Sequence, residues 1–216
     1  MILASLVKEI QNAFTEGAQI EKVQSLVKKA LAESISPIEI MNTMRDGLAT
    51  VGKKYEQGEL FLSELIISGI MAQEVSNILR PYLQNSETEF LGKVVIGTVK
   101  GDIHDLGKNL VSMMLTSAGF QVIDLGVDVS QEKFVEAARG DKPEVVAMSC
   151  LLTSAMDEMK LIVPRLEEAG VRNRVKVLVG GRPITPDFAR EIGADGYGKD
   201  AVDAVNVART ALKKAS

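Results

Sequence analysis

The apolar pattern of the chain changes near residue 90, and this change limits the possible folds more than any other feature. Before it, apolar residues recur every three or four positions, as they do on one face of an amphipathic helix. After it, short apolar runs alternate with helical patterns, which is typical of a parallel sheet covered by helices. The sequence therefore predicts an all-α domain at residues 1–88 and an α/β domain at residues 89–216.

The first domain is predicted to hold four helices. The third helix is expected to begin at Ser36-Pro37, with serine as its N-cap and proline at its first helical position. Ser63 is expected to cap the fourth helix. Gly47 and Gly69 fall inside helices, where glycine is unfavourable, and they indicate close approach of a neighbour. Such helices form a small bundle.

The second domain is predicted to alternate strands and helices after a polar linker at residues 84–89. Alternation of this kind gives a doubly wound parallel sheet with right-handed crossovers, but it does not give the order of the strands. Strands are predicted at residues 93–99, 121–125, 144–148, 175–179 and 195–198, and helices at residues 106–118, 130–139, 154–169, 186–192 and 200–213.

Composition and charge exclude several classes of protein. The formal net charge of −4 argues against a nucleic-acid partner, which would require a basic face. No apolar run approaches the ~18 residues that a membrane span requires, and the first residues lack a secretion-signal pattern. The single cysteine, Cys150, cannot form an intrachain disulfide and is expected to be a buried small residue rather than a reactive thiol. We expect a cytoplasmic protein without a membrane partner.

The only histidine of the chain, His104, lies between the first predicted strand and the helix that follows it. In open α/β sheets, ligands bind at this carboxyl end of the strands. Asp102 lies two residues earlier, so its carboxylate can hold one ring nitrogen and leave the other free as a metal ligand. Gly101 and Gly107 flank the pair and allow close approach of a large ligand. An ordinary hydrogen-bonded loop histidine is the alternative.

The pattern Asp102-x-His104-x-x-Gly107 resembles the cobalamin-binding signature Asp-x-His-x-x-Gly. The pieces that follow this signature in the family, Ser-x-Leu and Gly-Gly, match Ser149-Cys150-Leu151 and Gly180-Gly181. The chain thus resembles the corrinoid proteins of methyltransferase systems and the cobalamin-binding region of methionine synthase. The resemblance implies a flavodoxin-like (Rossmann-like) sheet and cobalamin or a related corrinoid as cofactor.

The same resemblance implies roles for individual residues. His104 would be the lower axial ligand of cobalt, and Asp102 would support it in a relay, although a helix N-cap is the alternative role for Asp102. Thr153 would line the pocket of the nucleotide tail, or would instead cap the helix at 154–169. The family's second relay serine is replaced by Ala155, so proton uptake at Asp102 would pass through water or Ser154. The cofactor-binding residues implied are Gly101, Asp102, Ile103, His104, Asp105, Gly107, Ser149, Leu151, Thr153, Gly180, Gly181, Gly196, Tyr197 and Gly198.

The helical domain also takes part in the resemblance. Residues 46–62 are similar to the cap module that covers the upper face of the corrin in this family. The aromatic and leucine positions that shield the methyl group fall on Tyr55 and Leu62. The alternative is that Leu62 belongs to the bundle core and that Tyr55 is a surface aromatic.

The resemblance implies a methyl carrier, which would act as a subunit of a methyltransferase system rather than as an enzyme alone. Its expected partners are a substrate-specific methyltransferase, an acceptor methyltransferase using tetrahydrofolate or a thiol, and a reductive reactivating protein. The cobalamin-binding subunit of an adenosylcobalamin-dependent mutase is one alternative, although the cap-like segment argues against it. A cobalamin-sensing regulator is another, although the chain has no basic recognition helix.

Overall fold

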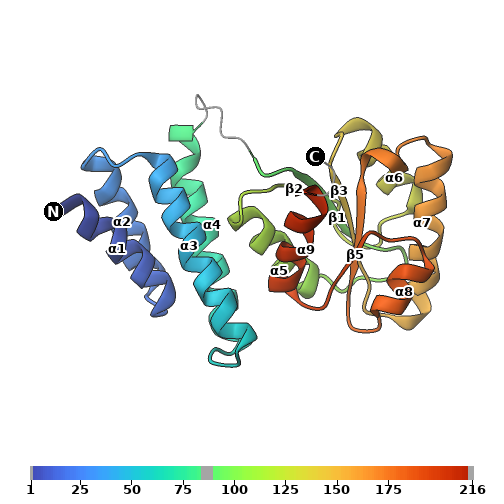
Figure 1. The fold of residues 1–216 in the computed structure, drawn as a ribbon, viewed down its shortest axis with the longest axis horizontal. Helices are drawn as coiled ribbons and strands as arrows, with labels where there is room; N and C mark the ends of the chain where they lie inside the picture. The colour runs from blue at the N-terminus through green and yellow to red at the C-terminus, as the bar shows by residue number, and fades with distance from the viewer. Residues whose placement is uncertain (1, 84–89, 214–216) are drawn as a thin grey trace. The chain divides into compact units, whose positions relative to one another are not determined.

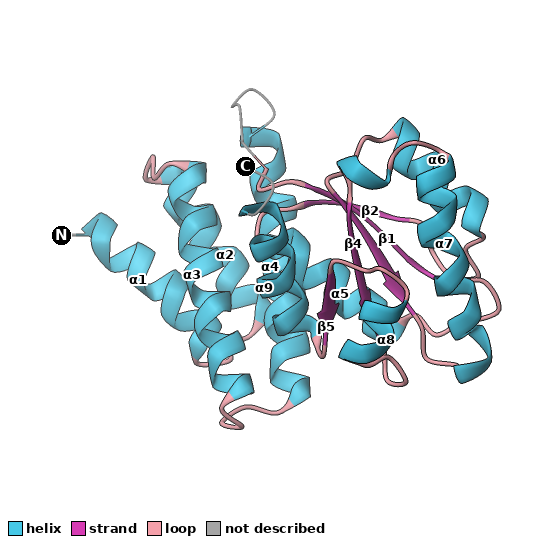
Figure 2. Cartoon of the chain, turned by 45° about the vertical axis from the view of Figure 1, so that its right-hand side comes forward, coloured by secondary structure: helices cyan, strands magenta, loops and turns pink. Residues whose placement is uncertain are grey.

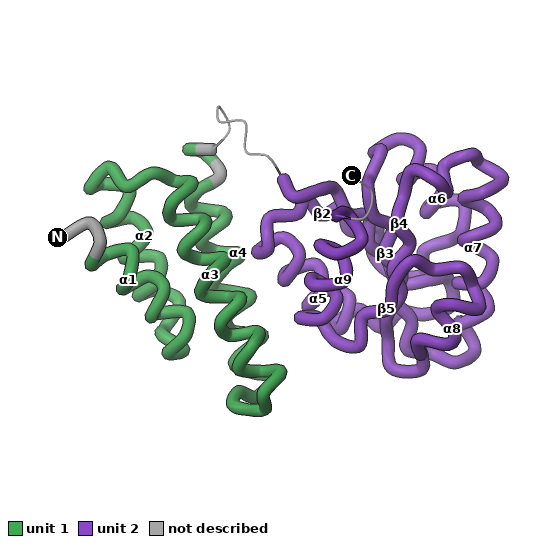
Figure 3. The backbone as a smooth tube through the Cα atoms, in the orientation of Figure 1, with its two compact units in different colours: residues 1–89 green, residues 90–216 purple. Residues whose placement is uncertain are grey.

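The computed structural model describes residues 2–83 and 90–213, which form two compact units, Met1–Glu89 and Phe90–Ser216 (Figure 3). Each unit has an apolar core of its own. The predicted linker at 84–89 and the predicted domain boundary at residue 88 lie outside the described residues. Within the ranges described, none of the helices combines the length and the apolar character that a bilayer crossing requires.

The first unit is the helical bundle that the periodicity predicts. It consists of α1 (Ile2–Thr15), α2 (Ile20–Ala32), α3 (Pro37–Glu56) and α4 (Leu62–Leu83) (Figure 1). The close approach expected at Gly47 is confirmed, because a Cβ there would lie 3.0 Å from the Cβ of Phe14 on α1. The largest fully buried side chains of this unit are Leu6, Ile10, Phe14, Ile40, Met44, Leu65, Met71 and Leu79.

The predicted start of α3 is confirmed, whereas the predicted start of α4 is wrong. Ser36 does precede α3, and Pro37 is its first residue, but the Ser36 side chain makes no capping hydrogen bond. Ser63 is not the N-cap of α4, because the helix already begins at Leu62. The reason lies in Glu64, whose carboxylate accepts a 2.7 Å hydrogen bond from the backbone N–H of Phe61. This contact satisfies an amide in front of the helix and moves its start toward the N-terminus.

The second unit is the predicted parallel sheet with helices on both faces. Its strands are β1 (Lys93–Thr98), β2 (Gln121–Asp124), β3 (Val145–Ser149), β4 (Lys176–Gly180) and β5 (Gly196–Gly198), in the spatial order β2-β1-β3-β4-β5 (Figure 2). All neighbouring strands pair in parallel. This is the flavodoxin-like order, so the predicted fold class is confirmed.

Helices cover both faces of this sheet. On one face lie α5 (Leu106–Ser117) and α9 (Ala201–Lys213), and on the other lie α6 (Gln131–Gly140), α7 (Met156–Glu168) and α8 (Pro186–Glu191) (Figure 1). The helix predicted at 154–169 begins as a 3₁₀ turn, Thr153–Ala155, and becomes α-helical at Met156. Because β1 pairs with both β2 and β3, the connections after β1 and β3 run to opposite faces of the sheet. This switch point is where ligands bind in such folds.

Candidate functional site

The sheet topology brings two distant predicted segments together. Thr98 at the end of β1 is the register partner of Ser149 at the end of β3. The loop of residues 101–107 and the segment of residues 149–153 therefore leave the same edge of the sheet side by side. Most of the predicted binding residues lie on these two segments, and Gly180-Gly181 and Gly196–Gly198 end the next two strands.

Asp102 links these two segments. Its side chain is fully buried. One carboxylate oxygen, Oδ2, accepts hydrogen bonds from the backbone N–H groups of Leu151 (2.5 Å) and Leu152 (3.1 Å). The other, Oδ1, accepts from the backbone N–H of His104 (3.0 Å) and lies 2.7 Å from His104 Nδ1. Asp102 therefore does not act as a helix N-cap, and that alternative is wrong.

These bonds determine the charge of Asp102 and the tautomer of His104. Burial alone would raise the pKa of Asp102, but the hydrogen bonds from His104, Leu151 and Leu152 outweigh it and lower the pKa from 3.8 to about 2. The carboxylate is thus ionised at neutral pH and can only accept hydrogen bonds. His104 Nδ1 must carry the proton between them, so the lone pair of neutral His104 lies on Nε2. The His104 side chain is 49% exposed, which leaves Nε2 accessible as a ligand.

Exposed apolar side chains lie beside His104 in the sequence. Others lie on the segments that follow the neighbouring strands, at the same edge of the sheet. Ile103 is 73% exposed and Leu106 is 71% exposed, although large apolar residues are usually buried. Leu151 and Leu152 after β3, and Val127 after β2, are exposed as well. Several exposed apolar side chains at one edge are typical of a binding site for an apolar surface.

Two further polar contacts fix the His104 loop, and neither was predicted from the sequence. Thr98, fully buried, donates its hydroxyl to the carbonyl of His104 at 3.0 Å. Lys108, also buried, pairs with Asp124 Oδ2 at 2.5 Å and joins the start of α5 to the end of β2. Thr98 and Asp124 are polar residues near the ends of two predicted strands. This position could have indicated the contacts, because the carboxyl ends of parallel strands meet at one edge of the sheet.

The residues predicted to line the tail pocket lie at this edge. Ser149 is half-buried at the end of β3, and the side chain of Thr153 is exposed. Thr153 begins the 3₁₀ turn and does not cap α7, whose N-cap is Ala155, so the capping alternative is wrong. Ala155 is buried. Ser154 is exposed and is not among the groups found bonded to Asp102, so a relay through Ser154 stays a prediction.

Protein atoms leave little room for a side chain at Gly180 and none at Gly181, at the end of β4. Gly181 has φ +128°, and a Cβ there would lie 1.8 Å from the carbonyl oxygen of Cys150. A Cβ on Gly180 would lie 3.0 Å from the carbonyl oxygen of Gly198. The ends of β3, β4 and β5 therefore lie close together at these glycines. Room for a nucleotide over Gly180 and Gly181, and closure of that slot by Tyr197, stay predictions.

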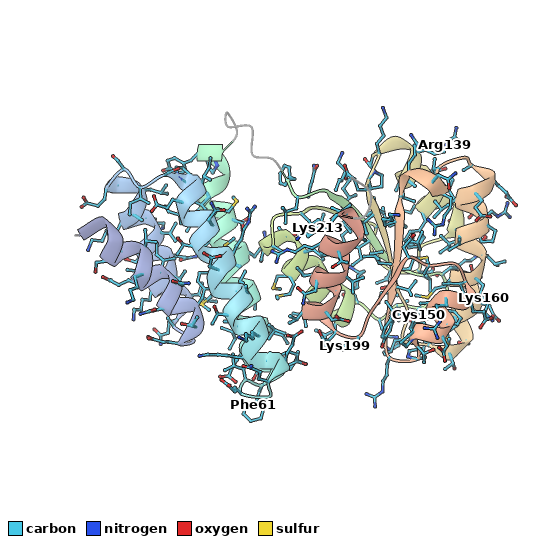
Figure 4. All side chains as sticks on the ribbon, viewed as in Figure 1. Phe61, Arg139, Cys150, Lys160, Lys199 and Lys213 are labelled. Carbon is cyan, nitrogen blue, oxygen red and sulfur yellow. The ribbon has the colours of Figure 1, made fainter. Side chains whose placement is uncertain are left out.

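Cys150 is buried within the α/β unit, as predicted (Figure 4). Its thiol donates to the carbonyl of Leu152 at 3.1 Å. Burial, followed by the nearby charge of Asp102, raises the pKa of the thiol to about 11. A buried, protonated thiol is a poor nucleophile, so this cysteine has a packing role.

The predicted cap residues lie around the turn between α3 and α4. Leu62 is 47% exposed, so the alternative that places it in the bundle core is wrong. Tyr55 is partly exposed near the end of α3. Phe61, which the sequence did not single out, is 80% exposed at the tip of the turn (Figure 4). Ile67 and Ile70 extend the exposed apolar surface along α4. We call Leu62, Ile67 and Ile70 the α4 apolar surface.

Comparison with known proteins identifies the family. A model described as a B12 binding domain matches residues 92–206, and a second model of the same description matches residues 6–80. The chain belongs to the B12-binding corrinoid proteins. The trimethylamine corrinoid protein 1 of Methanosarcina acetivorans is 40% identical over 210 residues, which cover 96% of this chain and 97% of that protein.

Solved structures agree with this family. A cobalamin-binding protein from Desulfitobacterium hafniense has a TM-score of 0.79 at 31% identity and covers 95% of this chain and 98% of that one. The methanol:cobalamin methyltransferase complex MtaBC from Methanosarcina barkeri contains a chain with a TM-score of 0.83 at 27% identity, covering 98% of this chain and 84% of that one. The fold class and the cofactor class predicted from the sequence are therefore confirmed.

The site of this B12-binding protein fits a corrinoid. A corrin is a broad, flat ring, and the exposed Ile103, Leu106 and Leu151 offer apolar contacts around the one histidine. Imidazole is a suitable ligand for a borderline transition metal such as cobalt. An imidazole whose other nitrogen donates to a carboxylate is the common arrangement for metal-binding histidines, because it fixes the tautomer and the ring orientation. The histidine supported by a carboxylate and the exposed apolar side chains around it thus suit this cofactor.

Proposed function

We propose that this protein carries a methyl group on the cobalt of a bound corrinoid from a donor on a substrate-specific methyltransferase to an acceptor on a second methyltransferase. The observation that carries the proposal is His104, whose Nε2 is accessible while Nδ1 is bonded to the buried Asp102, beside exposed apolar side chains. The acceptor is tetrahydrofolate or a thiol, and a reductive protein restores the active cofactor. The protein acts as a subunit of this system rather than alone.

The bound corrinoid supplies the methyl-transfer chemistry, because reduced cobalt is a strong nucleophile. The chain supplies ligation, orientation and exclusion of water. His104 would hold the cobalt through Nε2, and the ionised Asp102 keeps the imidazole in the tautomer that presents this nitrogen. Ile103, Leu106 and Leu151 support the ring.

The helical unit would cover the bound corrinoid as a cap. The α4 apolar surface and Phe61 support this role, because exposed apolar side chains are costly unless they meet a partner surface. Tyr55 and Leu62 would exclude water from the cofactor that the protein holds. This surface favours the methyl carrier over the small subunit of an adenosylcobalamin mutase, for which no such cap is expected.

The relatives support a small methylated molecule as donor. One relative is named a trimethylamine corrinoid protein, and a structural neighbour belongs to a methanol:cobalamin methyltransferase complex. We therefore propose that the partner methyltransferase of this chain acts on a methylated amine or on methanol.

Reconstitution with hydroxocobalamin tests the proposed site. The purified protein should stay coloured after desalting, and His104→Ala should change its visible spectrum because cobalt loses the imidazole ligand. Lys100→Ala is the matched control, since Lys100 is an exposed residue of the same loop. A wild-type protein that loses its colour, or a His104→Ala spectrum identical to that of wild type, would reject this site.

Cyanide binding to the cobalt of the reconstituted protein tests the cap. Leu62→Glu should accelerate cyanide binding, because the charge weakens contact between the α4 apolar surface and the corrin. Ile38→Glu is the control, since Ile38 is equally exposed (46% against 47%) but lies outside the predicted cap segment. Equal rates in both variants would argue against the cap role of Leu62.

A further inference from the structure

Asp128 lies in the loop between β2 and α6. It contacts the loop that carries His104 through both its side chain and its backbone. Its carboxylate Oδ1 accepts a 2.8 Å hydrogen bond from the backbone N–H of Gly101. Its own backbone N–H donates a 3.0 Å hydrogen bond to the carbonyl of Asp102. One residue thus brackets Gly101 and Asp102, which lie three and two residues before His104. We call this pair of bonds the Asp128 bracket.

The conformation of Asp128 makes the bracket possible. Its φ is +51°, in the left-handed region that residues other than glycine rarely adopt, although Asp and Asn tolerate it better than most. Pairing with β1 holds the loop on both sides of it. The N–H of Thr98 donates to the carbonyl of Gly126, and the N–H of Val129 donates to the carbonyl of Thr98, each at 3.0 Å. The unusual backbone is therefore imposed by the surrounding structure.

The bracket complements the contacts of the Asp102 side chain. The Asp102 carboxylate is bonded to backbone N–H groups after β3, and the Asp102 carbonyl is bonded to Asp128 after β2. The residue that orients His104 is thereby tied to both neighbouring strands of β1. A metal ligand depends on such support, because small changes in ring orientation weaken the bond to the metal.

We propose that Asp128 is a positioning residue for the lower ligand, which holds the Asp102 backbone so that His104 meets cobalt in the correct orientation. This proposal rests on the proposed role of His104. It requires the acceptor oxygen of Asp128 and the left-handed backbone, and it does not require the negative charge.

Comparison of aspartate, glycine and asparagine at position 128 separates these requirements. Glycine removes the carboxylate while it relieves the left-handed backbone, so the fold is expected to tolerate it. Asparagine keeps both an acceptor oxygen and the tolerance for this conformation. Lys142 offers the matched control, because it also has a positive φ (+49°) but lies in the connection from α6 to β3, at the amino end of the strands. Lys142→Gly therefore relieves the backbone away from the site.

The binding experiment uses the full chain titrated with hydroxocobalamin. Asp128→Gly should bind about 10-fold more weakly, at the lower end of the usual cost of losing a group that supports a metal ligand. Its visible spectrum should shift toward that of His104→Ala. Asp128→Asn and Lys142→Gly should match wild type in affinity and spectrum. Thermal unfolding of the cofactor-free proteins should give similar midpoints for Asp128→Gly and Lys142→Gly.

Hydrogen exchange in the cofactor-free protein supplies a readout that does not depend on the cofactor. The backbone amides of residues 101–104 should exchange faster in Asp128→Gly, and at the wild-type rate in Asp128→Asn and Lys142→Gly. If Asp128→Gly does not fold, Asp128→Asn decides the question, because a large loss of affinity in a variant that keeps the acceptor would overturn the proposal.

The outcomes distinguish this proposal from the proposed function. Wild-type affinity, spectrum and exchange in Asp128→Gly would overturn the positioning role and leave His104 as ligand. If His104→Ala and wild type have the same spectrum, the proposed ligand is wrong, whatever Asp128 does to the loop.

Discussion

Two aspartates at opposite edges of the same sheet show how a site differs from a structural contact. Asp102 follows β1 at the carboxyl edge and joins its loop to the end of β3. Asp195 precedes β5 at the amino edge and joins it to β4, because its carboxylate accepts a 2.7 Å hydrogen bond from the N–H of Val177. Each carboxylate therefore connects segments that are far apart in the sequence.

The two aspartates differ in the group that completes each network. Asp195 pairs with Arg172 at 2.9 Å, and the same guanidinium donates to the carbonyls of Val175 and Gly193. Its charge is neutralised within the protein. Asp102 instead meets His104, whose second ring nitrogen is accessible and lies among exposed apolar side chains. The difference teaches that unused ligand capacity, rather than the number of hydrogen bonds, indicates a site.

The largest expected effect concerns the backbone on which Asp102 depends. Gly181→Ala would place a Cβ 1.8 Å from the carbonyl oxygen of Cys150, next to the N–H groups that bind Asp102. With φ at +128° as well, we expect a loss of about 3 kcal/mol or more in the free energy of unfolding. Urea unfolding measures it. A loss below about 1 kcal/mol would show that the carboxyl edge can rearrange.

Replacing each aspartate by alanine tests the comparison directly. Asp102→Ala and Asp195→Ala should each lower the free energy of unfolding by about 3 kcal/mol, because both leave partly buried donors without an acceptor. Only Asp102→Ala should also change the visible spectrum of the protein reconstituted with hydroxocobalamin. If Asp195→Ala changed the spectrum equally, the two edges would not be separate in function.

Acid unfolding tests the lowered pKa of Asp102. Since the pKa of Asp102 falls from 3.8 to about 2 on folding, its ionised form stabilises the native state by about 2 kcal/mol. This contribution is complete above about pH 4 and is lost as the pH falls toward 2. Asp102→Asn should therefore be less stable than wild type at pH 6, and the difference should shrink by pH 2.5. A constant difference would contradict the lowered pKa.

The smallest expected effect on stability is that of Gly107→Ala. Nothing lies within 4 Å of a Cβ built on this residue in the first turn of α5, so the free energy of unfolding should rise by no more than about 1 kcal/mol. Affinity for hydroxocobalamin should nevertheless fall if the corrin approaches this backbone. Unchanged affinity would remove Gly107 from the binding surface.

Much of the fold follows from local patterns in the sequence. The predicted strands and helices of the α/β unit match the observed ones to within about two residues, because periodicity and turn residues act over a few positions. The Asp102-x-His104 pair is local too, and its hydrogen bond forms within the loop. The sequence therefore indicated the fold class and the candidate ligand, and its resemblance to the cobalamin-binding family implied the cofactor class.

The tertiary structure decided which distant groups support that ligand. Leu151 and Leu152 bind Asp102 from 49 and 50 residues away, and Asp128 binds Gly101 from 27 residues away. These partners meet because β1 lies between β2 and β3, and local periodicity does not encode the order of strands. The start of α4 likewise depended on a contact within one turn, between Phe61 and Glu64. Several neighbouring groups compete to form such contacts. The residue types alone do not show which group succeeds.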